Sequence, residues 1–238
     1  MANKMLLQVR GLVVAANQAV VPYIAGLQEV SPARIVDVYR TSWRILSFVT
    51  PPCFAALAGM APVISVLWLG SLQNDFVIFS IILAIANAVN VFSGPAYFSN
   101  LGEGELLLNA IAHVVMAVAN CVLGLVLGYL FGAFGVVTAN GLAIVLGSVL
   151  VVWAFHSRKQ VAVGKLFSAQ DLAVGVSCGL AALASAVVFQ YLAPTYRLAT
   201  VGAAMVCVFV GIIALPLWRH SARAWFGSKL RALGRGID

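Results

Sequence analysis

The sequence predicts an all-α integral membrane protein with about seven transmembrane helices. Of its 238 residues, 63% are hydrophobic and 9% are charged, whereas a soluble globular domain is about 45–50% apolar and about 25% charged. The mean hydropathy is +1.03. This composition excludes a soluble protein, a secreted disulfide scaffold and a nucleic-acid-binding domain.

The spacing of the charged residues supports the same fold class. Five uncharged stretches hold 30, 27, 52, 25 and 21 residues. Each can supply the roughly 20 apolar residues that cross a bilayer, and the longest can supply two crossings. The stretches lie between Arg44 and Asp75, Asp75 and Glu103, Glu105 and Arg158, Asp171 and Arg197, and Arg197 and Arg219.

The expected spans are residues 5–28, 44–69, 76–98, 106–131, 134–156, 172–193 and 198–218. Ser31-Pro32 ends the first, and the stretches 70–75 and 102–105 separate the next three. The break at 131–133 carries no charge, but a continuous helix over 106–156 would be about 75 Å long, far more than a bilayer requires.

Two groups of residues modify individual spans. Pro51, Pro52 and Pro62 predict that the second span is bent or locally unwound. Gly124, Gly128 and Gly132 form a smooth ridge, because they repeat every four residues. Such ridges allow close helix packing, and we favour packing within the chain over dimerisation.

The Lys and Arg residues divide unequally between the two sides of the membrane. With a cytoplasmic C-terminus, eleven lie on that side and three, Lys4, Arg10 and Arg197, lie on the other. The positive-inside rule therefore predicts an N-terminus outside the cell and a C-terminus in the cytoplasm. The basic tail 219–238 is expected to contact anionic headgroups, or to act only as a positive-inside stop signal.

Motifs for soluble catalysis are absent from the sequence. It contains no Walker A loop, no HExxH and no GxSxG, so we expect no catalytic residues, no cofactor and no enzymatic activity. The four cysteines lie in apolar stretches without ligand spacing, which predicts neither a disulfide framework nor a metal site. A retinal protein is disfavoured because the last span has no Lys.

Polar residues inside the spans are the candidate functional residues, because placing them in hydrocarbon is costly. They fall on shared helical faces and predict three helices that turn polar sides toward one hydrated cavity. The alternative is that the Asn and His residues are interhelical contacts and that Arg10 extends to the membrane surface. The candidate substrate-cavity residues are Arg10, Asn17, Asn87, Asn90, Asn109, His113 and Asn120.

The order of several loose motifs resembles a known family. The segment 39–44 (YRTSWR) opens a Pro-containing span that closes with 67–70 (LWLG), followed by 95–105 (PAYFSNLGEGE) and 131–140 (FGAFGVVTAN). This succession resembles the C-terminal lobe of Wzx-type polysaccharide and oligosaccharide flippases. They belong to the multidrug/oligosaccharide-lipid/polysaccharide exporter superfamily, which also contains the MATE exporters. The resemblance covers about residues 5–156.

The resemblance implies a domain organisation. Residues 1–156 would be five spans of the C-terminal lobe, 157–218 two additional helices, and 219–238 the cytoplasmic tail. Family members have two lobes around a central cavity, so a missing N-terminal lobe or a partner half is expected.

The implied function is translocation of lipid-linked oligosaccharide repeat units by alternating access in a bacterial inner membrane, with membrane lipids and that substrate as partners. Alternatives are a non-transporting membrane component, a truncated inactive fragment of a polysaccharide locus, or a membrane glycosyltransferase. The short loops argue against the glycosyltransferase.

Overall fold

The computed structural model describes residues 20–162 and 166–223, together with positions 4, 7, 8, 10, 11, 15 and 18. Within these residues all regular secondary structure is helical. The helices are α2 (Val20–Val30), α3 (Arg34–Leu69), α4 (Asn74–Gly102), α5 (Leu106–Lys159), α6 (Ala169–Leu192) and α7 (Leu198–Arg219). Five of them, α3 to α7, are long and apolar enough to cross a membrane.

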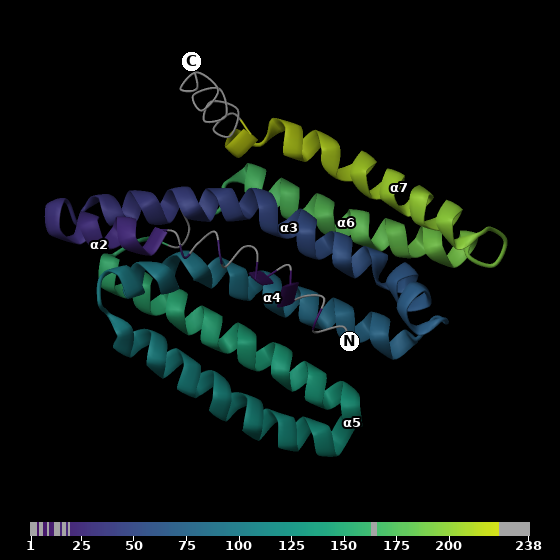
Figure 1. Ribbon diagram of the computed structural model, residues 1–238, viewed down its shortest axis with the longest axis horizontal. Coiled ribbons are helices and arrows are strands. Elements are labelled where there is room, and N and C mark those ends of the chain that lie inside the picture. The colour runs from purple at the N-terminus through teal and green to yellow at the C-terminus, as the bar shows by residue number, and fades with distance from the viewer. Residues whose placement is uncertain are drawn as a thin grey trace.

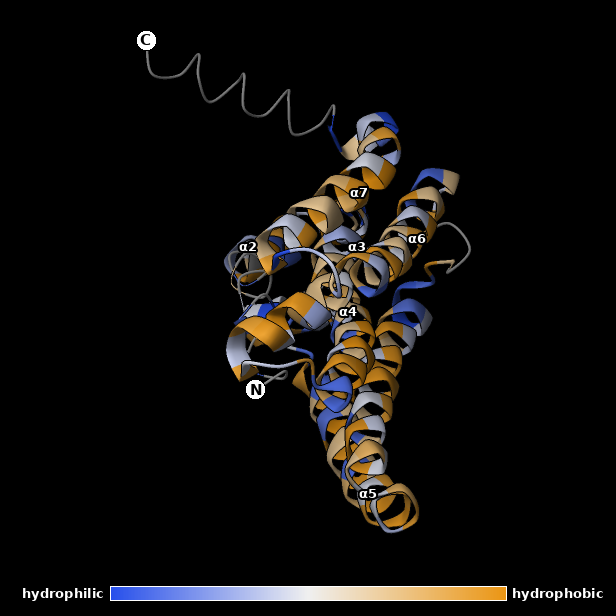
Figure 2. Cartoon of the chain, turned by 90° about the vertical axis from the view of Figure 1, so that its right-hand side faces the viewer, coloured by the Kyte–Doolittle hydropathy of each residue, from blue (hydrophilic) through white to orange (hydrophobic). Residues whose placement is uncertain are grey.

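Helix α3 is the centre of the arrangement. The α4–α5 pair packs on one side of α3 and the α6–α7 pair on the other (Figure 1). The short helix α2 packs against α4 and the start of α3 through Ile24, Leu27 and Ile35. Hydrophobic residues cover most of the length of α4 to α7 (Figure 2), as expected for helices that lie in hydrocarbon. The described chain is therefore a helical, multi-pass membrane protein.

Most of the expected breaks are confirmed. Helix α2 ends before Ser31-Pro32, α3 ends at a left-handed Gly70 with φ 76°, and Gly104 (φ 79°) lies in the turn between α4 and α5. A positive φ favours glycine because glycine has no Cβ to clash. The first expected span, residues 5–28, is described only in part, and α2 covers only its end.

The 54-residue helix α5 is a hairpin of two antiparallel arms (Figure 1). The turn is at Gly132, whose φ of 60° and ψ of −139° lie in a region that glycine alone occupies readily. The arms come close at Gly135, where an added Cβ would lie 1.8 Å from the Leu127 carbonyl oxygen. The predicted break at 131–133 is confirmed, and the two arms correspond to the fourth and fifth expected spans.

The three glycines of the ridge differ in how closely they approach the other arm of the hairpin. A Cβ at Gly128 would lie 2.9 Å from a Val136 methyl group on the other arm, whereas a Cβ at Gly124 would meet no atom within 4 Å. Close packing within the chain is therefore confirmed at Gly128. Gly132 makes the turn itself, and Gly124 faces open space.

Helix α3 differs from the second expected span in two respects. It begins at Arg34, ten residues earlier than residue 44, because Ile35, Tyr39 and Trp43 form a buried stripe at helical spacing beneath the charged side chains. It also stays helical through all three prolines, so of the two predicted alternatives, a bend or a local unwinding, the structure excludes the unwinding. Hydrogen bonds lost at proline are tolerated in a long helix that neighbouring helices support.

Candidate functional site

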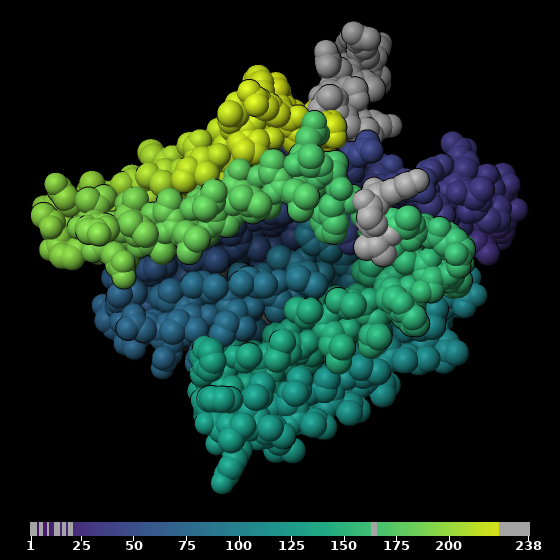
Figure 3. All heavy atoms as spheres, turned by 180° about the vertical axis from the view of Figure 1, so that it is seen from behind, coloured from purple at the N-terminus to yellow at the C-terminus, as the bar shows by residue number. Residues whose placement is uncertain are grey.

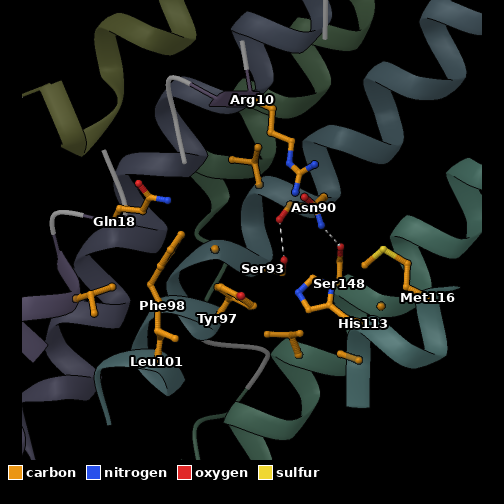
Figure 4. Close-up of a pocket in the computed structure, with 16 residues that line it drawn as sticks. Arg10, Gln18, Asn90, Ser93, Tyr97, Phe98, Leu101, His113, Met116 and Ser148 are labelled. Atoms are coloured by element: carbon orange, nitrogen blue, oxygen red, sulfur yellow. Dashed lines mark hydrogen bonds between the residues drawn. The ribbon is translucent and has the colours of Figure 1, made fainter. Parts of the chain in front are cut away.

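The candidate site is a pocket of about 530 Å³ between α4, the two arms of α5 and the N-terminal segment. Its polar side chains come from elements that are far apart in the sequence. Helix α4 supplies Asn90 and Ser93, and the two arms of α5 supply His113 and Ser148 (Figure 4). The N-terminal segment supplies Arg10 and Gln18.

Asn90 connects the wall formed by α4 to the wall formed by the second arm of α5. Its side-chain nitrogen donates a hydrogen bond to Ser148 Oγ at 2.9 Å, and Ser148 Oγ donates to the Ile144 carbonyl at 2.7 Å. Ser93 Oγ donates to the Asn90 carbonyl at 2.7 Å. These bonds fix the positions of the polar groups on this wall before any ligand binds.

Arg10 brings a positive charge to the pocket. Its side chain extends toward Asn90 (Figure 4), and the residue is partly buried. The Arg10 Nε is buried and has no hydrogen-bond partner among the described residues. A guanidinium donates in a planar fork that matches carboxylate and phosphate oxygens. Because Arg10 lines the pocket, its guanidinium can bind an anionic or strongly polar group there.

His113 lies on the first arm of α5, where its ring contacts Tyr97 edge-on. The two ring centroids are 5.6 Å apart and the planes are inclined by 80°. Both residues line the pocket together with Met116, one turn further along the arm. His113 thus offers a ring nitrogen to the same space that Arg10 enters from the N-terminal side (Figure 4).

The structure brings together three of the seven candidate cavity residues, Arg10, Asn90 and His113. Asn87 is buried and donates to the Leu83 carbonyl in its own helix at 2.8 Å. Asn120 is exposed on α5 and does not line the pocket. Asn17 lies outside the described residues.

Asn109 joins the end of α4 to the start of α5 instead of lining the pocket. Its Oδ1 accepts from Asn100 at 3.0 Å, and its Nδ2 donates to the Tyr97 carbonyl at 2.9 Å. Since Tyr97 lines the pocket, Asn109 supports the pocket wall from behind. The sequence pattern identified Asn109 but not its partner Asn100.

A charged cluster at the same end of the bundle continues this support. Arg158, at the end of α5, donates to Asn100 Oδ1 at 2.8 Å and pairs with Glu103 at 2.5 Å. Lys159 also pairs with Glu103 at 2.7 Å, and Glu105 lies 3.5 Å from Arg158. The Glu103 side chain is only 3% exposed, so both cations compensate a buried carboxylate.

Sequence reasoning missed this cluster, although a signal was present. Glu103 and Glu105 were expected in the turn between the third and fourth spans, and Arg158 and Lys159 after the fifth. Both places lie on the same side of the membrane in the predicted topology. Because the acidic and the basic residues lie on short segments of the same side, ion pairs between them could have been predicted from the sequence.

Comparisons with known proteins identify no relative of the chain, so any functional assignment depends on the geometry of the site. No protein-family model, no curated protein and no solved structure matches the chain. Across the described residues, no three His, Cys, Asp or Glu side chains are grouped so that they could hold a metal ion. All four cysteines are free.

Proposed function

We propose that the chain is a membrane flippase, or the C-terminal half of one, that translocates lipid-linked oligosaccharide repeat units for surface polysaccharide biosynthesis. The observation that carries this proposal is the pocket itself, in which polar side chains from α4, both arms of α5 and the N-terminal segment meet within a mainly apolar lining. Polar and ionisable groups at membrane depth mark pathways for substrates or ions.

The chemistry of the pocket fits a phosphorylated saccharide headgroup. Amide and hydroxyl groups, such as those of Asn90 and Ser93, are suited to hydrogen-bond sugar hydroxyls, while the Arg10 guanidinium is suited to a phosphate. The volume of about 530 Å³ falls within the roughly 300–1,000 Å³ of ordinary ligand pockets.

The proposal includes a bacterial inner-membrane location, an N-terminus outside and a cytoplasmic C-terminus. The second wall of the transport cavity would come from a partner half, and transport would proceed by alternating access between two sides. Transport takes place between two sides of a membrane, so the test uses the whole chain in its own cell.

The test is complementation of a strain that lacks the gene, with surface polysaccharide as the readout. Arg10→Ala and His113→Ala are expected to reduce polysaccharide strongly at wild-type protein levels, because both side chains line the pocket. Arg197→Ala, an exposed arginine before α7, and Val114→Ala, an exposed neighbour of His113, are the matched controls and should retain activity.

Two outcomes would contradict the proposal. Wild-type polysaccharide in both pocket variants would leave only a packing role for these residues. Unchanged polysaccharide after deletion of the gene would favour a non-transporting component or an inactive fragment.

A further inference from the structure

The three histidines of the chain differ in what holds them in place. His156 is buried with its Nε2 2.7 Å from the Tyr39 hydroxyl, and His220 is buried with its Nε2 2.8 Å from Asp171 Oδ1. His113 is exposed, and within the part of the chain that the structure describes no hydrogen bond holds its ring. Packing therefore accounts for the first two histidines, whereas His113 is available to a ligand in the pocket that it lines.

His113 lies among the polar side chains of the pocket. In Figure 4 its ring lies beside the side chains of Ser93 and Ser148, while the Arg10 guanidinium extends toward Asn90. The hydrogen bond from Asn90 to Ser148 joins these groups across the pocket. The imidazole and the guanidinium therefore face the same space from two different elements of the fold.

The described lining of the pocket has few charged or titratable groups. Helix α4 contributes Tyr97, the first arm of α5 contributes His113, and the second arm of α5 contributes none. The N-terminal segment contributes Arg10, and no other charged residue stands between Lys4 and Glu29 in the sequence. This lining therefore holds one fixed positive charge, gains a second when His113 is protonated, and includes no carboxylate.

Charged residues elsewhere in the described chain do not change this balance. At the nearby end of the bundle, two carboxylates and two cations pair with one another and do not line the pocket: Glu103, Glu105, Arg158 and Lys159. Helices α6 and α7 are separated from the α5 hairpin by α3 and α4 over most of their length (Figure 3). No residue of α3, α6 or α7 belongs to the described lining. A ligand in the pocket therefore meets the charges of Arg10 and His113.

A ligand with two negative charges is not neutralised by Arg10 alone. An uncompensated charge in a mainly apolar pocket is costly, so the free energy of binding favours the state in which an imidazole beside the ligand carries a proton. Because an ordinary histidine has a pKa of about 6.5, such a proton is readily supplied near neutral pH. Since coupled binding is reciprocal, the proton and the dianion each raise the affinity for the other.

We propose that the pocket binds a ligand with two negative charges, the diphosphate of a lipid-linked saccharide, together with one proton on His113. A saccharide linked through a single phosphate carries one charge, is balanced by Arg10 and binds without a proton. This inference rests on the proposed function, because it names the charge of the headgroup and the proton that accompanies it.

The test is isothermal titration calorimetry of the full-length chain in detergent with two ligands, farnesyl diphosphate glucose and farnesyl phosphate glucose. Every phosphate in both ligands is a diester whose charge stays constant near neutral pH, so any proton taken up belongs to the protein. Buffers that differ in ionisation enthalpy report this uptake. For a histidine of ordinary pKa, we expect about 0.9 proton per diphosphate bound at pH 7.5 and almost none with the monophosphate. The affinity for the diphosphate should fall by up to about eightfold from pH 7 to pH 8.

His113→Gln keeps a polar side chain but cannot take up the proton. In this variant the diphosphate should bind without proton uptake and with an affinity that does not change with pH, while the affinity for the monophosphate stays the same. Asn120→Gln is the matched control, because Asn120 is exposed on the same arm and does not line the pocket; it should keep the uptake. His113→Asn replaces His113→Gln if thermal unfolding shows that the glutamine variant does not fold.

The same diphosphate with a methyl group in place of the farnesyl chain distinguishes a lipid-linked ligand from a water-soluble one. Because most of the pocket lining is apolar, the methyl compound should bind more than tenfold more weakly. Equal affinities would assign the pocket to a soluble saccharide diphosphate and overturn the lipid-linked part of the proposal.

Three results would overturn the role of His113. The first is binding of the diphosphate to the wild-type chain without proton uptake and without dependence on pH. The second is unchanged uptake in a folded His113→Gln protein, which would assign the proton to another group. The third is the absence of binding of either farnesyl ligand. The proposed function fails on a separate result, wild-type polysaccharide in cells with Arg10→Ala and His113→Ala, so binding that is independent of pH leaves that function standing.

Discussion

On one side of α3, α4 and α5 are joined by polar contacts, whereas on the other side α6 and α7 pack mainly through apolar side chains. The α4–α5 contacts include Asn90 with Ser148 and Arg158 with Glu103. The α6–α7 interface is built on buried residues such as Val174, Cys178 and Phe209. Apolar packing in a bilayer permits small shifts, while directional bonds fix one register. The side with fixed register is the side that carries the pocket.

The largest expected effect comes from breaking the charged cluster on the α4–α5 side. Arg158→Met leaves Glu103, which is 3% exposed, with Lys159 alone, and removes the donor to Asn100. Removing one partner of a buried ion pair costs about 3–5 kcal/mol. Because Arg158 is itself 25% exposed, we expect a loss near 3 kcal/mol in the free energy of unfolding.

Chemical unfolding in detergent measures this loss. Arg44→Met changes an exposed arginine of α3 and is the control for loss of charge. Equal effects of the two substitutions would show that the cluster does not hold α4 and α5 together.

A smaller loss in the free energy of unfolding is expected from a steric clash inside the α5 hairpin. Gly135→Ala places a Cβ 1.8 Å from the Leu127 carbonyl oxygen, so the two arms must separate. Overpacking of this kind costs about 1–3 kcal/mol. Gly124→Ala, with no atom within 4 Å of the added Cβ, should be neutral or gain up to about 1 kcal/mol in helix propensity. Thermal unfolding of both variants checks this, and similar shifts would exclude close contact of the arms at Gly135.

The smallest expected effect is on the α6–α7 side, at the local cap of α6. Ser168 caps α6 by accepting from the Asp171 N–H, and Asp171 accepts in return from the Ser168 N–H at 2.7 Å. Ser168→Ala should therefore cost about 1 kcal/mol without changing the pocket. Asp171 keeps its contact with His220 at 2.8 Å. A larger loss, or a loss of polysaccharide in the cell, would show that the two sides of α3 are coupled.

Hydrophobicity and charge spacing were sufficient to predict helices and turns. The ends of α6 and α7 lie within three residues of the predicted spans, because charged or capping residues mark them. The hairpin turn at Gly132 was predicted from bilayer thickness alone. The early start of α3 was not predicted. The charged residues Arg34, Asp37 and Arg40 indicated a segment outside the membrane, although the buried residues between them have helical spacing.

The pocket could be predicted only in part. Arg10, Asn90 and His113 were identified because each is polar in an apolar segment. Their convergence with Ser148 depends on how α5 folds back along α4, which local sequence does not specify. Asn109 shows what the sequence does not specify. Its polar side chain was evident, but its hydrogen-bond partner Asn100 is identified only by the turn that brings the two residues together.

The turn at Gly132 also bears on how the chain enters the membrane. The hairpin has no charged residue along 52 positions, from Leu106 to Ser157, so its tip carries no charged group that resists translocation. Its tip instead exposes Tyr129, Phe131 and Phe134, side chains suited to the headgroup layer. The two arms can therefore be inserted together as one unit, with the charged ends at Glu105 and Arg158 retained on the side from which the hairpin entered.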